Sequence, residues 1–250
     1  MRGRPAVLVI AGSDSSGGAG ILRDLTVLAG LGCEALCAIS AVTAQTHGRL
    51  VSVHHVPPQV IRTQIRAALE SAAIGAIKIG MLGTAATVSA VADSLPPGGT
   101  IPVVLDPVLV SSSGGVLLDE EGRAEMRARL FPLATLITPN IPEAASLCGT
   151  APAASREELL AQARSLLATG TRAVLLKGGH AGGAESVDLL LTAHGTAQWL
   201  SSPRLQAGSR GTGCALASAI AAGLASGSTI EAACDSAKRY VHSLLSQEAL

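Results

Sequence analysis

Glycine and hydroxyl residues crowd a turn near the start of the chain. The run Gly12-Ser13-Asp14-Ser15-Ser16-Gly17-Gly18-Ala19-Gly20 follows the apolar residues 7–11 and precedes a helical pattern. Such a turn exposes backbone N–H groups that can hold an anion or a polar ligand. A P-loop would require Lys where Gly18 stands, and a GxGxxG fingerprint would require Gly where Arg23 stands. The alternative is a flexible glycine-rich turn without a ligand.

A second glycine-rich turn comes late in the chain. Gly211-Thr212-Gly213-Cys214 opens the apolar helical segment 215–224. The two glycines permit a tight turn, so several N–H groups can converge at the positive end of the helix. This arrangement suits the charge of a phosphoryl group during transfer. Cys214 would lie in the first helical turn, where the pKa of a thiol is usually lowered. The alternative is a helix cap with a small buried cysteine.

An amide and a carboxylate follow the apolar segment 136–138. Asn140 and Glu143 are three residues apart at a predicted helix start, so both could face one site. Such a pair can hold a hydrated magnesium ion, which typically keeps several waters. The alternative is that Asn140 caps the helix and Glu143 completes the capping arrangement.

One carboxylate and one ammonium group end two further apolar segments. Asp106 follows residues 101–105 and would point into the same crevice, where it could repel or orient magnesium-bound phosphate. Lys177 follows residues 173–176 and can neutralise phosphate as a point charge. Only three of the 18 basic residues are lysines, namely Lys78, Lys177 and Lys238, which makes a functional role for Lys177 the preferred interpretation.

The elements that must position these residues alternate along the chain. Predicted strands are residues 7–11, 35–42, 76–79, 101–105, 136–138 and 173–176, with a late hairpin over 187–191 and 197–200. Predicted helices are residues 21–31, 60–73, 87–95, 120–130 and 159–167, because apolar residues recur there at three-four spacing. Alternation of this kind indicates an α/β protein with a mostly parallel sheet, which binds ligands at the carboxyl ends of its strands. We expect one domain over residues 1–250.

Composition narrows the class of partner. The 18 basic and 18 acidic residues cancel, so no basic surplus exists for a nucleic-acid backbone. No apolar stretch reaches the roughly 18–20 residues of a membrane span, and the apolar run near the N-terminus predicts a buried strand and not a signal peptide. Five cysteines without metal-ligand spacing predict reduced thiols in a cytoplasmic protein.

Together these motifs resemble the hydroxymethylpyrimidine kinase branch of the ribokinase-like superfamily. The matching stretches extend over nearly the whole chain: residues 11–21, 24–25, 43–45, 78–82, 105–108, 138–140, 142–143, 177–180 and 211–214. The resemblance implies a three-layer α/β/α fold, ATP with Mg²⁺ as cofactors, and a homodimer. It also implies two successive phosphorylations, first of 4-amino-5-hydroxymethyl-2-methylpyrimidine and then of its monophosphate.

The resemblance assigns roles to particular residues. The pyrimidine would be held by Gly12, Asp24, Gln45 and Met81, and a carboxamide such as Gln45 offers both a donor and an acceptor to an aminopyrimidine edge. Phosphoryl transfer would use Lys177 and the turn Gly211-Thr212-Gly213-Cys214. The nucleotide would contact Asn140, Lys177 and Thr212, and the metal would lie near Asp106 and Glu143. Cys214 stands where many sugar kinases have an Asp base, so we expect it to assist proton removal from the alcohol.

The chain departs from the family pattern at three places. Ser209-Arg210 replaces the end of an Asn-Thr-His run before the GTGC turn, so Arg210 could take over a phosphate contact or the loop could move differently. Ser112 replaces a frequent Lys, and we expect the family's usual glycine-rich tail to be absent after the last helix, which ends near Leu250.

Three other functions compete with this interpretation. A pyridoxal or pyridoxine kinase of the same superfamily is the nearest, and Gln45 argues for the aminopyrimidine against it. A catalytically silent pyrimidine-binding protein is disfavoured by the joint presence of Asp106, Glu143, Lys177 and the GTGC turn. The spacing of the first glycine-rich turn disfavours a dinucleotide oxidoreductase.

Overall fold

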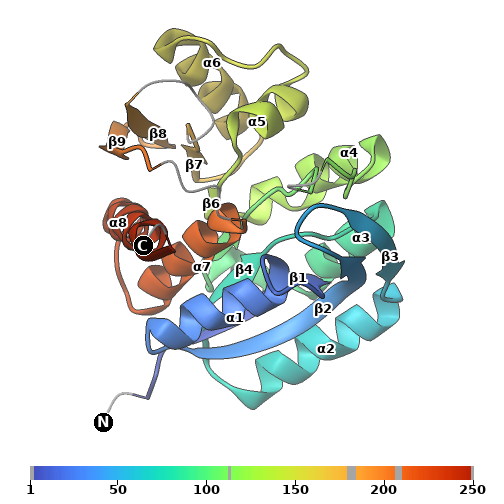
Figure 1. Ribbon diagram of the computed structural model, residues 1–250. Helices are drawn as coiled ribbons and strands as arrows, with labels where there is room; N and C mark the ends of the chain where they lie inside the picture. Colours follow the sequence, from blue (N-terminus) through green and yellow to red (C-terminus); the bar gives the residue numbers. More distant parts are fainter. Residues whose placement is uncertain (1–2, 112–113, 179–183, 206–209, 249–250) are drawn as a thin grey trace.

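A single twisted sheet runs through the protein in the computed structural model, which describes residues 3–111, 114–178, 184–205 and 210–248. Within these ranges nine strands pair in the order β3-β2-β1-β4-β5-β6-β7-β8-β9 (Figure 1). They are β1 (Ala6–Asp14), β2 (Glu34–Gln45), β3 (Leu50–His55), β4 (Ile74–Ile79), β5 (Val103–Leu105), β6 (Leu136–Ile137), β7 (Ala173–Leu176), β8 (Glu185–Thr192) and β9 (Ala197–Pro203). The motif residues Gly179 and His180, together with Ser112, Ser209 and Leu250, lie outside the described residues.

Most neighbouring strands run parallel. β2, β1, β4, β5, β6 and β7 form a parallel set, whereas β3 pairs antiparallel with β2, β8 with β7, and β9 with β8. The predicted mostly parallel sheet is therefore confirmed. The chain builds outward from β1 first through β2 and then through β4, so the order reverses at β1, where open α/β sheets bind ligands.

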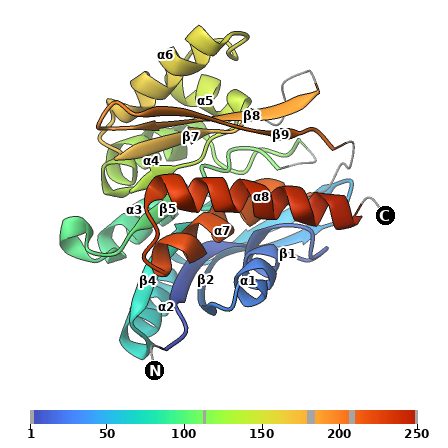
Figure 2. The ribbon, with the colours of Figure 1, turned by 90° about the vertical axis from the view of Figure 1, so that its left-hand side faces the viewer.

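Helices cover both faces of this sheet. They are α1 (Gly20–Gly30), α2 (Pro58–Ser71), α3 (Ala85–Ser94), α4 (Glu120–Arg129), α5 (Ile141–Cys148), α6 (Arg156–Leu167), α7 (Thr212–Ala225) and α8 (Ile230–Glu248), with short 3₁₀ turns η1 (Pro97–Gly99) and η2 (Phe131–Leu133). One core packs α2 to α6 against one face, and the other packs α1, α7 and α8 against the opposite face (Figure 2). The predicted three-layer α/β/α fold is confirmed.

Strand β1 shows how the sequence specifies two cores. Leu8 and Ile10 pack into the first core, while Val7 and Val9 pack into the second, because successive side chains of a strand point to opposite faces. All four are fully buried, which explains why the segment reads as a continuous apolar run.

Strand β3 was not among the predicted strands. It lies at one edge of the sheet, and Val51, His54 and His55 are exposed. Its half-polar sequence lacks the apolar run that marked the central strands. The strand forms because it pairs with β2. The other predicted strands and helices exist, with ends that coincide or are displaced by at most three residues.

Two structural findings bear on the predictions that were made from the amino-acid composition. No helix among the described residues is both long and apolar enough to cross a membrane. All five cysteines carry free thiols, as predicted.

Candidate active site

A cavity of about 900 Å³ lies at the carboxyl ends of the parallel strands. Its walls include every residue that the sequence predicted for the site except Asp24: Gly12, Gln45, Met81, Asp106, Asn140, Glu143, Lys177, Gly211, Thr212, Gly213 and Cys214. Strand ends far apart in sequence meet here because parallel strands present their carboxyl ends to one edge. We call the region of Gly12, Gln45 and Met81 the recognition end, and the region of Asp106, Glu143, Lys177 and the GTGC turn the transfer end.

Asp24 lies beneath the cavity. Its side chain is fully buried in α1, and its carboxylate accepts from Lys78 Nζ at 2.7 Å and from Ser218 Oγ at 2.8 Å. Burial opposes the charge of Lys78, but Asp24 together with Cys214 and Asp106 outweighs it, so the pKa of that ammonium is raised. Lys78 lines the cavity, so Asp24 reaches the site through its partner, and direct substrate contact by Asp24 stays a prediction.

An ion pair dominates the transfer end. Lys177 Nζ lies 2.7 Å from Asp106 Oδ1, and Thr138 Oγ1 donates to the same oxygen at 3.0 Å. Burial opposes ionisation of Asp106, but Lys177 and Lys78 outweigh it and lower its pKa. Lys177 therefore faces an anionic partner, and Asp106 Oδ2 remains directed toward the GTGC turn, 3.6 Å from the place of a Cβ on Gly213.

The sheet fixes this geometry through its backbone. The N–H groups of Asp106, Thr138 and Lys177 donate to the ends of the neighbouring strands, to Ile79 O, Leu105 O and Pro139 O at 2.8–2.9 Å. The parallel ladder thus continues one step beyond the strands and sets the spacing of the functional side chains.

Asn140 and Glu143 form the helix-capping arrangement at the start of α5. Asn140 Oδ1 accepts from Glu143 N, and Glu143 Oε2 accepts from Asn140 N, both at 2.8 Å. Burial raises the pKa of Glu143 to about 7, with Lys177 opposing and Asp106 adding to the shift. Capping uses the single side-chain oxygen of Asn140 and one of the two oxygens of Glu143, whose carboxylate also accepts from the backbone of Leu109. Both residues line the cavity, where Asn140 Nδ2 is a donor and the Glu143 carboxylate keeps further lone pairs for a ligand.

The GTGC turn packs tightly against the first glycine-rich turn. Gly211 adopts φ +73°, and a Cβ there would lie 2.2 Å from Gly18 O, so this position requires glycine. At Gly213 a Cβ would lie 3.1 Å from Lys177 Nζ. The N-terminus of α7 is therefore directed at the Lys177–Asp106 pair, where its N–H groups can meet an anion.

The expected lowering of the Cys214 pKa is wrong. Cys214 does lie in the first turn of α7, but burial raises the pKa of its thiol to about 11, with Lys78 opposing that shift. Removal from water outweighs the field of the helix end. The thiol is therefore protonated at neutral pH before substrate binds.

The recognition end combines an amide, a thioether and bare backbone. Gln45 ends β2, and Met81 follows β4, where Ser40 Oγ donates to Met81 O at 2.6 Å. A Cβ on Gly12 would lie 2.8 Å from Met81 Sδ, so glycine lets the sulfur approach the backbone of β1. A flat ring could lie against this polarisable surface.

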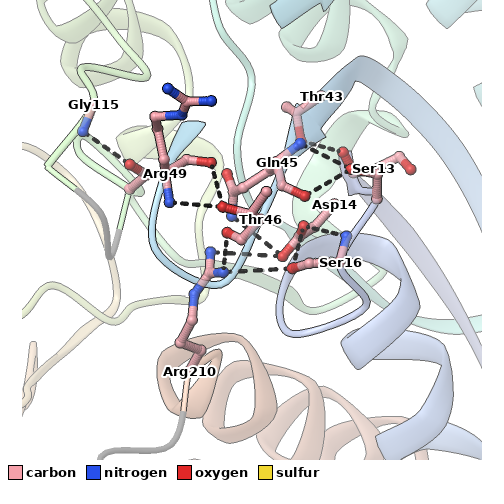
Figure 3. Close-up of polar contacts among 11 residues, drawn as sticks. Ser13, Asp14, Ser16, Thr43, Gln45, Thr46, Arg49, Gly115 and Arg210 are labelled. Carbon is pink, nitrogen blue, oxygen red and sulfur yellow. Dashed lines mark hydrogen bonds and ion pairs between the residues drawn. The ribbon is translucent and has the colours of Figure 1, made fainter. Parts of the chain in front are cut away.

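Arg210 turns away from the transfer end, although a phosphate contact was one of its two expected roles. Its Nη1 donates to Thr46 O at 2.8 Å and to Ser16 Oγ at 3.4 Å, and its Nη2 lies 3.7 Å from Asp14 Oδ2 (Figure 3). Arg210 thus ties the turn before α7 to the ends of β1 and β2.

Sequence reasoning assigned no site role to Lys78, Lys238, Asp188 or Asp14, all of which line the cavity. Lys238 Nζ contacts Asp188 Oδ2 at 2.7 Å, and the other oxygen of Asp188 accepts from Gly178 N at 2.9 Å. All three lysines of the chain therefore line one cavity, and each pairs with an aspartate. The scarcity of lysine in the sequence was the signal that could have pointed to Lys78 and Lys238.

The fold and this site define a small-molecule kinase of the ribokinase-like type. Residues 14–250 match the family described as phosphomethylpyrimidine kinase, and the chain belongs to that family. It is 42% identical over 238 residues to the hydroxymethylpyrimidine/phosphomethylpyrimidine kinase of Streptomyces coelicolor, covering 95% of this chain and 87% of the relative.

Solved structures from two kinase groups share the fold. The phosphomethylpyrimidine kinase of Clostridium difficile 630 superimposes with a TM-score of 0.84 at 34% identity, covering 97% of this chain and all of that one. A pyridoxal kinase of Staphylococcus aureus in complex with pyridoxal gives a TM-score of 0.89 at 31% identity, covering 98% of this chain and 89% of that one. The fold alone therefore does not separate the two substrate classes.

Proposed function

We propose that this protein transfers the terminal phosphoryl group of ATP to 4-amino-5-hydroxymethyl-2-methylpyrimidine and then to the resulting monophosphate. The diphosphate so formed serves thiamine phosphate synthesis. The observation that carries the proposal is that one cavity joins Gln45 and Met81 at one end to the Asp106–Lys177 pair at the other.

Recognition would use the carboxamide of Gln45. An aminopyrimidine edge presents an N–H donor beside a ring-nitrogen acceptor, and a carboxamide offers the complementary acceptor and donor. Met81 and Gly12 would support the face of the ring. The hydroxymethyl group would then extend toward the GTGC turn.

Transfer would depend on charge held in place. The hydroxyl oxygen attacks the terminal phosphorus, the bond to the ADP oxygen breaks, and the hydroxyl proton leaves. Lys177 and the N–H groups at the start of α7 would stabilise the charge on the moving phosphoryl group. The thiolate form of Cys214, a minor form at neutral pH because the pKa of the thiol is raised to about 11, would take up the alcohol proton in the first step only, since the second step attacks with an anionic phosphate.

The carboxylates present fit a magnesium ion bound with nucleotide. No group of three or more acidic, His or Cys side chains that could hold a metal alone occurs among the described residues. Magnesium commonly takes one or two carboxylates and completes its shell with phosphate and water. Thr138 and Lys177 both donate to Asp106 Oδ1. Asp106 Oδ2 and the carboxylate of Glu143 would therefore supply the protein ligands of the ion. The ion would neutralise phosphate charge.

Pyridoxal phosphorylation is the second candidate. The pyridoxal kinase noted above matches this chain over almost its full length. Both substrates are flat six-membered rings that carry a hydroxymethyl group, so the transfer end would serve either one.

The assay that tests the proposal measures ADP release with Mg-ATP, offering the aminopyrimidine and pyridoxal in parallel and resolving products by mass. Preferred turnover of the pyrimidine, continuing to the diphosphate, is the expected result. Preference for pyridoxal would overturn the assignment in favour of the second candidate. Binding of pyrimidine without turnover of either substrate would make the protein a non-catalytic binder.

We also propose that the chain acts as one domain, as a homodimer, in the cytoplasm. The continuous sheet supports a single domain, and the free thiols support a cytoplasmic location. Sedimentation of the purified protein tests the dimer.

A further inference from the structure

The carboxylate of Asp14 is the centre of a polar network at the recognition end. It is 4% exposed, and its Oδ1 accepts from Ser16 N at 2.9 Å and from Ser16 Oγ at 2.8 Å. Its Oδ2 accepts from Gln45 Nε2 at 3.3 Å and lies 3.7 Å from Arg210 Nη2. Figure 3 shows Gln45, Ser16 and Arg210 converging on this one side chain.

A carboxylate can only accept hydrogen bonds, so Asp14 decides which way the Gln45 amide turns. The NH₂ group of Gln45 must face Asp14, which frees Gln45 Oε1 to accept from a ligand. The backbone of Gln45 is held independently, since its N–H and C=O both bond to Ser15 Oγ, at 2.8 and 2.9 Å. The amide orientation is therefore the remaining variable.

Arg210 holds the carboxylate of Asp14 in place. Its Nη2 lies 3.7 Å from Asp14 Oδ2, the oxygen that also accepts from Gln45 Nε2. Its Nη1 donates to Thr46 O and Ser16 Oγ, so one guanidinium joins the turns after β1 and β2 around Asp14. The cation therefore fixes the oxygen that sets the orientation of the Gln45 amide.

We propose that Asp14 and Arg210 are positioning residues that set substrate selectivity through Gln45. With its oxygen free, Gln45 selects a ring edge that carries an amino donor and rejects an edge that carries only acceptors, such as the phenolate side of pyridoxal. This inference rests on the proposed function for the identity of the substrate. It gives Arg210 a task distinct from phosphate binding.

Asp14→Asn gives the sharpest test. Ser16 N requires an acceptor at the position of Oδ1, so the Asn amide must place its NH₂ group where Oδ2 now faces Gln45. Two NH₂ groups cannot bond to each other, and Gln45 must turn its oxygen inward. We expect kcat/KM for the aminopyrimidine to fall roughly 10- to 100-fold, and that for pyridoxal by less than about threefold.

Arg210 is tested by a conservative pair and a matched control. Arg210→Gln should lower the pyrimidine-to-pyridoxal selectivity ratio about 3- to 10-fold, and Arg210→Lys should restore most of it. Arg49→Gln removes a nearby exposed arginine whose guanidinium points away from the network in Figure 3, and should leave the ratio unchanged.

A measurement without substrate separates this inference from the proposed function. The side-chain amide of Gln45 gives ¹⁵N NMR signals that can be assigned by their loss in Gln45→Leu. These signals should shift in Asp14→Asn and Arg210→Gln but not in Arg49→Gln. Unshifted signals in Asp14→Asn, or an unchanged selectivity ratio beside an active wild type, would overturn the inference. A wild type that does not phosphorylate the pyrimidine would overturn the proposed function, and the NMR signals would still decide the network.

Discussion

The two ends of the cavity are built from different interactions. At the transfer end, an ion pair of 2.7 Å between Lys177 and Asp106 is fixed by the backbone ladder of the sheet. At the recognition end, Gln45, Asp14 and Arg210 are held by hydrogen bonds and a longer ion pair between turns. The function of the transfer end depends on the amount of charge near the phosphoryl group. The function of the recognition end depends on the direction in which hydrogen-bond donors and acceptors point. Substrate identity can therefore change at one end while the chemistry at the other is kept.

Lys177→Met should give the largest effect. It removes the charge that faces the phosphoryl group, and we expect kcat to fall roughly 100- to 1,000-fold in both phosphorylations. Arg62→Met breaks an exposed pair with Asp93 far from the cavity and serves as the control. Steady-state kinetics with both acceptors measures the effect. A rise in KM with unchanged kcat would place Lys177 in acceptor binding instead.

Gln45→Leu should weaken pyrimidine binding at the recognition end and leave the transfer end unaffected. The variant loses the amide donor and acceptor while keeping the size of the side chain, so kcat/KM for the pyrimidine should fall roughly 10- to 100-fold, mainly through KM. Slow ATP hydrolysis without acceptor should be unchanged. Loss of that hydrolysis would show that the two ends are not separable.

Cys214→Ser should separate the two chemical steps. With a thiol pKa of about 11, the thiolate fraction rises about tenfold per pH unit below that value. If the thiolate takes the alcohol proton, the first phosphorylation should quicken as pH rises from 7 to 9, and Cys214→Ser should slow it about tenfold or more. The second phosphorylation should follow neither trend. Equal loss of both steps would argue against a base role.

Glu143→Gln should change the pH dependence of stability. Folding raises the pKa of Glu143 from 4.5 to about 7, so the folded state holds this proton where the unfolded chain has lost it. The contribution of this proton to the free energy of unfolding is complete below pH 4.5 and disappears as pH rises through 7. The stability lost over this range is up to about 3 kcal/mol. Urea unfolding of Glu143→Gln should lack this decline. Glu158→Gln, which alters the exposed cap of α6, should retain it.

Much of the fold could be predicted because the central strands are buried on both faces. Residues 173–176 match β7 residue for residue, whereas the edge strand β3 owes its form to pairing with β2. Most predicted site residues line the cavity because motifs at strand ends share one edge of the sheet. Asp24 shows the limit, since only the packing of α1 reveals that its carboxylate meets Lys78. The pKa of Cys214 likewise depends on burial that local sequence does not express.

The central claim is that the pyrimidine is recognised at the Gln45 end and phosphorylated at the Lys177 end. Calorimetric titration of the aminopyrimidine into wild type, Gln45→Leu and Lys177→Met, without nucleotide, tests it most directly. We predict that Lys177→Met binds within about threefold of wild type, while Gln45→Leu binds roughly 10- to 100-fold more weakly. Full affinity in Gln45→Leu, with binding lost in Lys177→Met, would contradict the account.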